Sequence, residues 1–306
     1  MEVFAEKRVR GDQVWHHAYL MPSYGFSMLY TTMANPERIG NTVRLIPYLY
    51  LPFIRGTRSS FGMRIGWGLG YVSNAYDRLE NNKQIAIGSR VNTAIHIMPQ
   101  YRYNAGRWLV TGGIGIDHWS NASYQLPNLG LNYLNASLGV GYTLAEAPAP
   151  VADVPIVEEP AAIREYSVVG AFGINETGRP LNGKHSVFSL SGQVQWRVST
   201  KSRVSVGADL FNKGSLVDQY PELRGNDRLS LTQAGIHGGY ALGFGRGELF
   251  FQMGAYVYSP MPDDAPFYHR TGMRFRSGKH MVWNFSLKSH YANADHFEIG
   301  LGYRWD

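Results

Sequence analysis

The sequence predicts an all-β protein, folded as a single transmembrane antiparallel β-barrel of about fourteen strands. Three observations indicate this class. The 306 residues include 35 Gly and 20 Tyr, and only 17% of the residues are charged. Apolar residues occupy every second position over runs of more than about ten residues, which is typical of strands that face lipid on one side. No stretch reaches the run of about 18 apolar residues that a transmembrane helix needs.

The composition also excludes several kinds of site. The chain has no cysteine, which rules out disulfides, thiol catalysis and cysteine-based metal sites. The net charge of +6 is diffuse and suits an anionic surface, and no nucleic-acid-binding module is recognisable. Histidines such as those in "WHH" at 15–17 lack the spacing of metal ligands. We therefore expect no cofactor, no metal and no nucleic acid partner.

The first element, residues 1–23, is predicted as an N-terminal segment that precedes the first strand. It begins with "MEVFAEKRVRGDQ", which is polar throughout and does not resemble a signal peptide. For an exported protein we therefore expect that residue 1 follows a processing site or lies inside a longer chain. Strands follow wherever apolar residues alternate with small or polar ones, as in "SFGMRIGWGLGYV". The predicted strands are 24–33, 41–54, 60–73, 90–104, 107–120, 132–144, 165–174, 185–198, 203–212, 229–243, 248–258, 267–276, 280–291 and 295–305.

The connections between these strands alternate in length, and this alternation orients the chain. Turns such as "RGTRS" and "NAG" are short, whereas residues 74–89, 121–131, 175–184 and 213–228 form long connections. Outer-membrane barrels have short periplasmic turns and long outer loops. The strand that ends at Ser120 is therefore expected to run outward.

One connection breaks the alternation. Residues 145–164 contain "AEAPAPVADVPIVEEPAA", which is rich in Pro, Ala and acids and predicts an extended linker on the periplasmic side. It separates one half of the barrel, 24–144, from the other, 165–306. Six strands make only a small barrel, so we predict one continuous barrel, closed by pairing of residues 24–33 with residues 295–305, rather than two barrels.

A group of polar residues interrupts the lipid-facing pattern near the end of one strand. In "RWLVTGGIGIDHWSN", His118 and Ser120 share the parity of the apolar residues that face lipid, and Asn132 has the same parity on the next strand. We therefore expect three polar side chains together on the outer wall. Polar groups facing hydrocarbon are costly, which favours a functional site. The alternative is that His118 and Ser120 already lie among lipid headgroups.

The longer pattern around these residues resembles a known family. "HWSN" followed by "LPNLGLN" is similar to the signature of PagL-type lipid A 3-O-deacylases, which are outer-membrane barrels whose Ser and His face the outer leaflet. The upstream "AIGSRVN" (Ala86–Asn92) resembles that family's longer relatives, often labelled acyloxyacyl hydrolases. The specific resemblance covers roughly residues 24–144. In the second half, "YHRTGMRF" and "LKSHYANADHFEIGLGYRW" resemble the C-terminal extension of those relatives.

This resemblance implies a role for each residue of the polar group. Ser120 matches the family nucleophile, His118 its general base, and Asn121 the residue thought to help form the oxyanion hole. Asn132 stands where the family has its acidic third member. An amide still orients an imidazole, but it does not offset the imidazolium charge. The site would lie at the outer-leaflet side of the outer membrane of a Gram-negative bacterium.

Two further groups of residues are candidates for the same site. Arg38, Lys83 and Arg90 would hold lipid A phosphates, although basic loop residues usually serve solubility. The segment "HYANA" (His290–Ala294) repeats the pattern of "HWSNA" with alanine in place of the serine. By parity, His290 and Glu298 are predicted to face the lumen rather than to take part in catalysis.

The sequence therefore predicts a serine esterase that removes an ester-linked acyl chain from lipopolysaccharide. Its expected partners are lipid A and outer-membrane lipid, and contact with other outer-membrane proteins stays open. The rival prediction is a non-catalytic barrel that acts as a channel or as a subunit of a membrane assembly. The amide at Asn132 and the large second half favour this rival.

Overall fold

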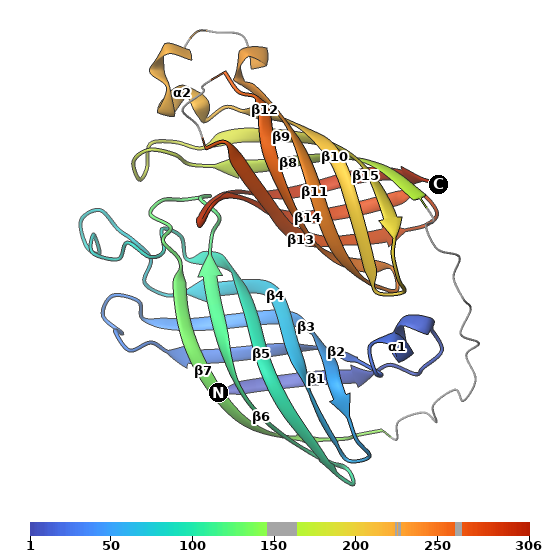
Figure 1. The fold of residues 1–306 in the computed structure, drawn as a ribbon. Helices are drawn as coiled ribbons and strands as arrows, with labels where there is room; N and C mark the ends of the chain where they lie inside the picture. Colours follow the sequence, from blue (N-terminus) through green and yellow to red (C-terminus); the bar gives the residue numbers. More distant parts are fainter. Residues whose placement is uncertain (146–163, 224, 226–227, 261–264) are drawn as a thin grey trace. The chain divides into compact units, whose positions relative to one another are not determined.

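The computed structural model describes residues 1–145, 164–223, 225, 228–260 and 265–306. These residues form fifteen strands, and every pairing between neighbouring strands is antiparallel (Figure 1). The chain divides into two compact units, one built from β1–β7 and the other from β8–β15 together with Ala122–Leu126. No helix in the described part of the chain is long and apolar enough to cross a membrane.

The first unit is a seven-stranded meander in which each strand pairs with the next one in sequence. Short turns such as the one at Gly106, which has a φ of +63°, join consecutive strands at one end of the sheet. Longer connections join them at the other end, whereas the long β1–β2 connection, which contains α1, lies at the end with the short turns. The elements are β1 (Glu2–Arg8), α1 (Val14–Ala18), β2 (Ser23–Thr32), β3 (Asn41–Arg55), β4 (Ser59–Val72), β5 (Val91–Ala105), β6 (Trp108–Ser120) and β7 (Leu131–Tyr142).

The seven-stranded sheet is curved so that its two outermost strands approach each other. A Cβ atom added to Gly141 of β7 would lie 3.1 Å from Phe4 Cζ of β1, although no ladder joins these strands among the described residues. The curvature encloses a cavity of about 620 Å³. Arg44, Arg64 and Asp117 are among the residues that line it. The inner face of this unit is therefore polar, as the alternation of the strands predicts.

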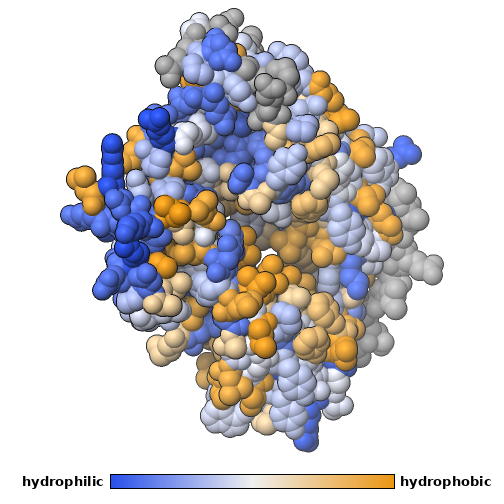
Figure 2. All heavy atoms as spheres, turned by 60° about the vertical axis from the view of Figure 1, so that its left-hand side comes forward, coloured by the Kyte–Doolittle hydropathy of each residue, from blue (hydrophilic) through white to orange (hydrophobic). Residues whose placement is uncertain are grey.

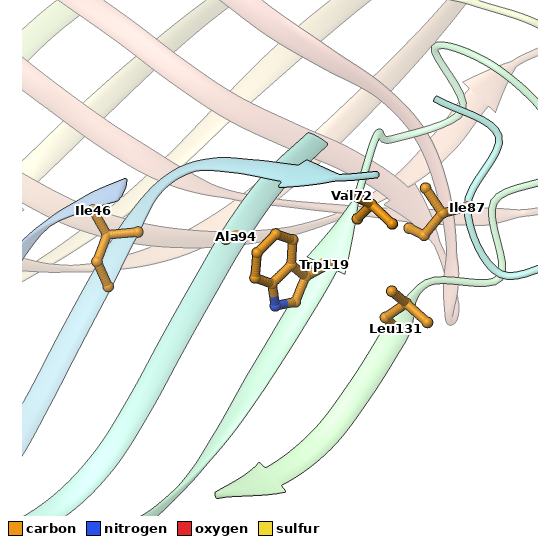
Figure 3. Packing of buried hydrophobic residues seen from close by; sticks show 6 residues of the cluster. All are labelled: Ile46, Val72, Ile87, Ala94, Trp119 and Leu131. Atoms are coloured by element: carbon orange, nitrogen blue, oxygen red, sulfur yellow. The ribbon is translucent and has the colours of Figure 1, made fainter. Parts of the chain in front are cut away.

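An apolar cluster occupies the interior of the first unit near the ends of β4 and β6. Trp119 is completely buried and lies among the other members (Figure 3). Ile87 comes from the connection between β4 and β5, so this connection folds inward over the sheet. We call this group the apolar plug; its members are Ile46, Val72, Ile87, Ala94, Trp119 and Leu131.

The second unit is a closed eight-stranded barrel. Its elements are β8 (Arg164–Asn175), β9 (His185–Arg197), β10 (Ser202–Lys213), α2 (Leu216–Gln219), η1 (Pro221–Leu223), η2 (Arg228–Leu231), β11 (Thr232–Phe244), β12 (Gly247–Tyr258), β13 (Phe267–Ser277), β14 (Met281–His290) and β15 (Asn293–Trp305). Pairing of β15 with β8 closes the barrel. Paired charges fill its interior; Asp209, for example, contacts His237 at 2.7 Å and Arg270 at 2.8 Å.

The outer faces of both sets of strands are apolar. The exposed large hydrophobic residues include Ile114, Ile116 and Leu134 in the first unit and Ile299 and Leu301 in the second. Figure 2 shows such hydrophobic residues as extensive orange patches on the molecular surface. Water-exposed patches of this extent are unusual in soluble monomers, whereas lipid-facing strands require them.

The structure confirms the all-β class and corrects the predicted architecture. The single barrel closed by residues 24–33 and 295–305 is wrong, because β15 pairs with β8 and β14, and β2 pairs with β1 and β3. Strand β1 was missed within the predicted N-terminal segment 1–23, because its inner face carries Glu2 and Glu6. The predicted linker, 145–164, lies outside the described residues except at its two ends.

Cysteine cross-linking distinguishes the two architectures, because the natural chain has no cysteine. Val168 of β8 and Tyr303 of β15 are direct neighbours across the closing seam. We expect V168C/Y303C to form an intramolecular cross-link on oxidation, detected by a mobility shift on a denaturing gel. The control pair M28C/Y303C joins strands that the single barrel would have paired. Cross-linking of the control pair but not of V168C/Y303C would contradict the observed closure.

Candidate active site on strands β6 and β7

Strand β6 has one outward and one inward face. The even-numbered residues Trp108, Ile114 and Ile116 are exposed, whereas Thr111 and Asp117 are buried. His118 and Ser120 continue the even-numbered series at the end of the strand. The pleat therefore assigns both residues to the apolar outer wall.

His118 and Asn132 are brought together by the pairing of β6 with β7. They are direct cross-strand partners, and His118 Nδ1 lies 2.7 Å from Asn132 Oδ1. Because an amide oxygen only accepts hydrogen bonds, the imidazole donates from Nδ1. In the neutral imidazole this leaves Nε2 without a proton, which is the tautomer that a general base requires.

The Ser120 hydroxyl contacts Asn128, an asparagine outside the predicted set of site residues. Asn128 Nδ2 donates to Ser120 Oγ at 2.9 Å, and Asn128 Oδ1 lies 3.3 Å from the same hydroxyl oxygen. Asn128 belongs to the connection between β6 and β7, and this contact helps to leave Ser120 only 5% exposed. Ser120 is therefore covered by the connection that follows it.

Asn121 is held by two neighbours. Its backbone N–H donates to Asn128 Oδ1 at 3.0 Å, and its side-chain Nδ2 donates to Ser89 Oγ at 3.0 Å. On the other side of Ser120, Thr93 Oγ1 donates to the Ser120 carbonyl at 3.0 Å. Asn128 thus contacts both residues of the Ser120–Asn121 pair. In the sequence, Asn128 stands in the "LPNLG" part of the motif that resembles the family, and the resemblance implies no role for it.

Gly130 makes room for the histidine. Its φ is +80°, a conformation that favours glycine, and its N–H donates to the Ala86 carbonyl at 2.9 Å. A Cβ atom at this position would lie 2.9 Å from His118 Cε1. A larger residue would therefore strain the backbone and push against the imidazole.

The basic residues predicted to bind phosphate come from connections that contact one another. The Arg38 carbonyl accepts from Asn81 Nδ2 at 2.9 Å, which links the β2–β3 connection to the β4–β5 connection carrying Lys83 and Arg90. Within the latter connection, the backbone N–H groups of Glu80 and Leu79 hold the pKa of Asp77 below its ordinary value. A role of Arg38, Lys83 and Arg90 in phosphate binding stays a prediction.

Two carboxylates that lie close to candidate histidines in sequence are engaged elsewhere. Asp117 precedes His118 but is completely buried on the inward face, where it pairs with Arg44 and lies 3.1 Å from His96. Glu298 of the second unit accepts hydrogen bonds from Ser189 and Ser286, each at 2.8 Å, inside its own barrel. Neither carboxylate takes the place of the missing acid. Among the described residues, no group of His, Asp and Glu side chains has the arrangement of a metal site.

Comparison with protein families accounts for both halves of the chain. Residues 1–141 match the family "Lipid A 3-O-deacylase (PagL)". Residues 164–306 match the family "Acyloxyacyl hydrolase, C-terminal domain". No curated protein matches the chain.

Several solved membrane barrels show a weak likeness to the chain. A de novo designed transmembrane β-barrel is 14% identical with a TM-score of 0.28, and the match covers 48% of this chain and 98% of that one. The outer membrane phospholipase (OMPLA) of Salmonella typhi is 12% identical with a TM-score of 0.21, covering 92% of this chain and 89% of that one. Outer membrane phospholipase A of Escherichia coli is 11% identical with a TM-score of 0.21, covering 92% and 94%.

The family matches, rather than these likenesses, assign the chain. They cover nearly all of the described residues, and they include the strand pair that holds His118, Ser120 and Asn132. The chain belongs to the family of PagL lipid A 3-O-deacylases, and it acts as an outer-membrane lipid A deacylase.

Proposed function

We propose that Ser120 and His118 cleave an ester-linked acyl chain from lipid A, with Asn132 orienting the histidine. The observation that carries this proposal is the 2.7 Å hydrogen bond between His118 and Asn132, beside a serine two residues along the same strand. It supports a nucleophile, a base and an orienting group on two paired strands, which is the arrangement that acyl transfer needs.

In the proposed reaction, Ser120 Oγ attacks the ester carbonyl carbon while its proton passes to His118 Nε2. The resulting tetrahedral oxyanion collapses and expels the sugar alkoxide, which takes the proton from His118. Water then attacks the acyl enzyme, His118 accepts a proton from it and returns that proton to Ser120, and the fatty acid leaves. No step of the proposed reaction needs an oxidant, a reductant or a metal.

Asn128 and Asn121 are the candidate donors to the oxyanion. Asn128 Nδ2 already lies 2.9 Å from Ser120 Oγ. A small shift would bring it to the oxyanion, which forms on the ester carbon that Ser120 Oγ attacks. The side-chain amide of Asn121 is engaged with Ser89, which favours Asn128 over Asn121 for this role. This assignment differs from the one that the family resemblance implied.

The outward face of β6 and β7 suits a substrate that arrives from the membrane. Ile116 and Leu134 are the next cross-strand partners on the same face as His118 and Asn132, and both are exposed. An acyl chain can lie along this apolar face, whereas the sugar and phosphates stay at the level of the connections. We place the site at the outer leaflet, because the long connections lie at this end of the sheet.

The first test removes the nucleophile or the base. We expect Ser120→Ala to lower the rate of fatty acid release from lipid A by at least about 10³-fold, and His118→Ala to lower it by about 10²–10⁴-fold. Mass spectrometry of lipid A from purified protein in vesicles measures both rates. Ser137→Ala on β7 is the control and should retain activity. Unchanged release by Ser120→Ala would show that Ser120 is not the nucleophile and would sink the proposal.

The second test restores the charge that the family pattern places opposite the histidine. Asn132→Glu should raise kcat by about tenfold, equivalent to roughly 1.4 kcal/mol, because a carboxylate stabilises the imidazolium and makes a charge-assisted hydrogen bond. Asn132→Gln has the same length without the charge and serves as the matched control. Equal rates for the two variants would show that the charge has no role.

The third test concerns the oxyanion donor. Asn128→Asp keeps the oxygen that anchors Asn121 but loses the Nδ2 donor. We expect kcat to fall by about 10²–10³-fold, with little change in KM. Thr93→Val alters a neighbouring contact of Ser120 without touching its hydroxyl, and it should stay within a few-fold of the natural protein. A kcat of Asn128→Asp as high as that of Thr93→Val would exclude Asn128 as the donor.

A further inference from the structure

The hydrogen bond between His118 and Asn132 depends on how β7 is aligned with β6. Among the described residues, β7 is an edge strand that pairs only with β6. Asn132 is exposed, so its bond to the imidazole competes with surrounding polar groups and adds little by itself. A slip of one residue would turn Asn132 to the other face of the sheet. Some other interaction must therefore hold the register at this point.

Two hydrogen bonds on the inner face start from the residues that flank His118 on β6. Trp119 Nε1 donates to Tyr133 OH at 3.0 Å, and Asn135 Nδ2 donates to Asp117 Oδ2. The residues on either side of His118 are thus bonded to β7, at positions one and three residues beyond Asn132. We call these two bonds the luminal ties.

The β6 ends of the two luminal ties are themselves fixed. Trp119 is completely buried in the apolar plug. Asp117 is also completely buried, and its other carboxylate oxygen bonds to Arg44 of β3 and lies 3.1 Å from His96 of β5. Arg44 also contacts Glu2 of β1 at 3.3 Å. The ties therefore connect β7 to four other strands through the interior.

From this geometry we infer that Tyr133 and Asn135 are positioning residues for the deacylase site: through the luminal ties they hold Asn132 within hydrogen-bond reach of His118. The inference rests on the proposed roles of His118 and Asn132. The neutral amide at position 132 makes the ties more important, since it forms a weaker bond to the imidazole than a carboxylate would. Misplacement of a catalytic group by a fraction of an ångström is enough to slow a reaction measurably.

Tyr133→Phe tests this inference with little change in shape. It removes the acceptor of the Trp119 bond, and kcat should fall by about tenfold with KM nearly unchanged. Asn135→Ala removes the other tie and should act in the same direction, which covers the case in which one variant fails to fold. Thr111→Val is the matched control, because Thr111 Oγ1 contacts the Gly139 carbonyl at 3.5 Å across the same two strands, far from His118. Its kcat should stay within about twofold.

A double-mutant cycle separates positioning from general weakening of the barrel. If the ties act through Asn132, Tyr133→Phe should cause no further loss in a protein that already carries Asn132→Ala. Losses that multiply in the double variant would overturn the inference. So would a loss in Thr111→Val as large as that in Tyr133→Phe.

A readout independent of turnover distinguishes failure of this inference from failure of the proposed reaction. In Ser120→Ala protein, ¹⁵N NMR of His118 reports the hydrogen bond at Nδ1. We expect Tyr133→Phe, but not Thr111→Val, to shift the Nδ1 resonance toward that of Asn132→Ala. An unchanged resonance overturns the role of the ties. A shifted resonance, together with unchanged fatty acid release by Ser120→Ala, would leave the role of the ties intact and reject only the catalytic role of Ser120.

Discussion

The buried carboxylate of Asp117 is the constraint on which the first unit depends. A charge with no exposure to solvent costs several kcal/mol unless it is paired and hydrogen bonded. Arg44, His96 and Asn135 meet this requirement from three different strands. These bonds to the Asp117 carboxylate fix which residues of β6 and β7 lie opposite each other. The outer face, with His118 beside Asn132, follows from that alignment.

The alternation of residues made much of this predictable. Apart from β1, the predicted strands overlap those of the structure, because a pleated strand between lipid and a polar interior must alternate. The same period placed His118, Ser120 and Asn132 on one face. A loop of about ten residues between the two strands then left few registers, and the structure pairs His118 with Asn132 directly.

Alternation along the strands could not predict which strands close the barrel or where the residues of the connections lie. Period two tells which way a side chain points, but it does not tell which strand lies beside the first or the last one. The choice between one barrel and two was therefore made from strand number, and it failed at β15, whose partner is β8. Asn128 was overlooked for a related reason. It lies in a non-repetitive connection, where hydrogen bonds to Ser120 and Asn121 rather than periodicity determine its position.

The apolar plug has a consequence for the supply of water. None of its six members lines the cavity of the first unit, so the cavity ends beneath them and does not continue to the end of the sheet where Ser120 lies. Any water that entered this cavity, which Arg44 and Arg64 line, would be separated from Ser120 by the packed hydrocarbon of the plug, including the indole of Trp119. In the proposed reaction, the molecule that hydrolyses the acyl enzyme has to come from the headgroup side. Release of the fatty acid is then coupled to the hydration of the membrane surface and is independent of the interior of the protein.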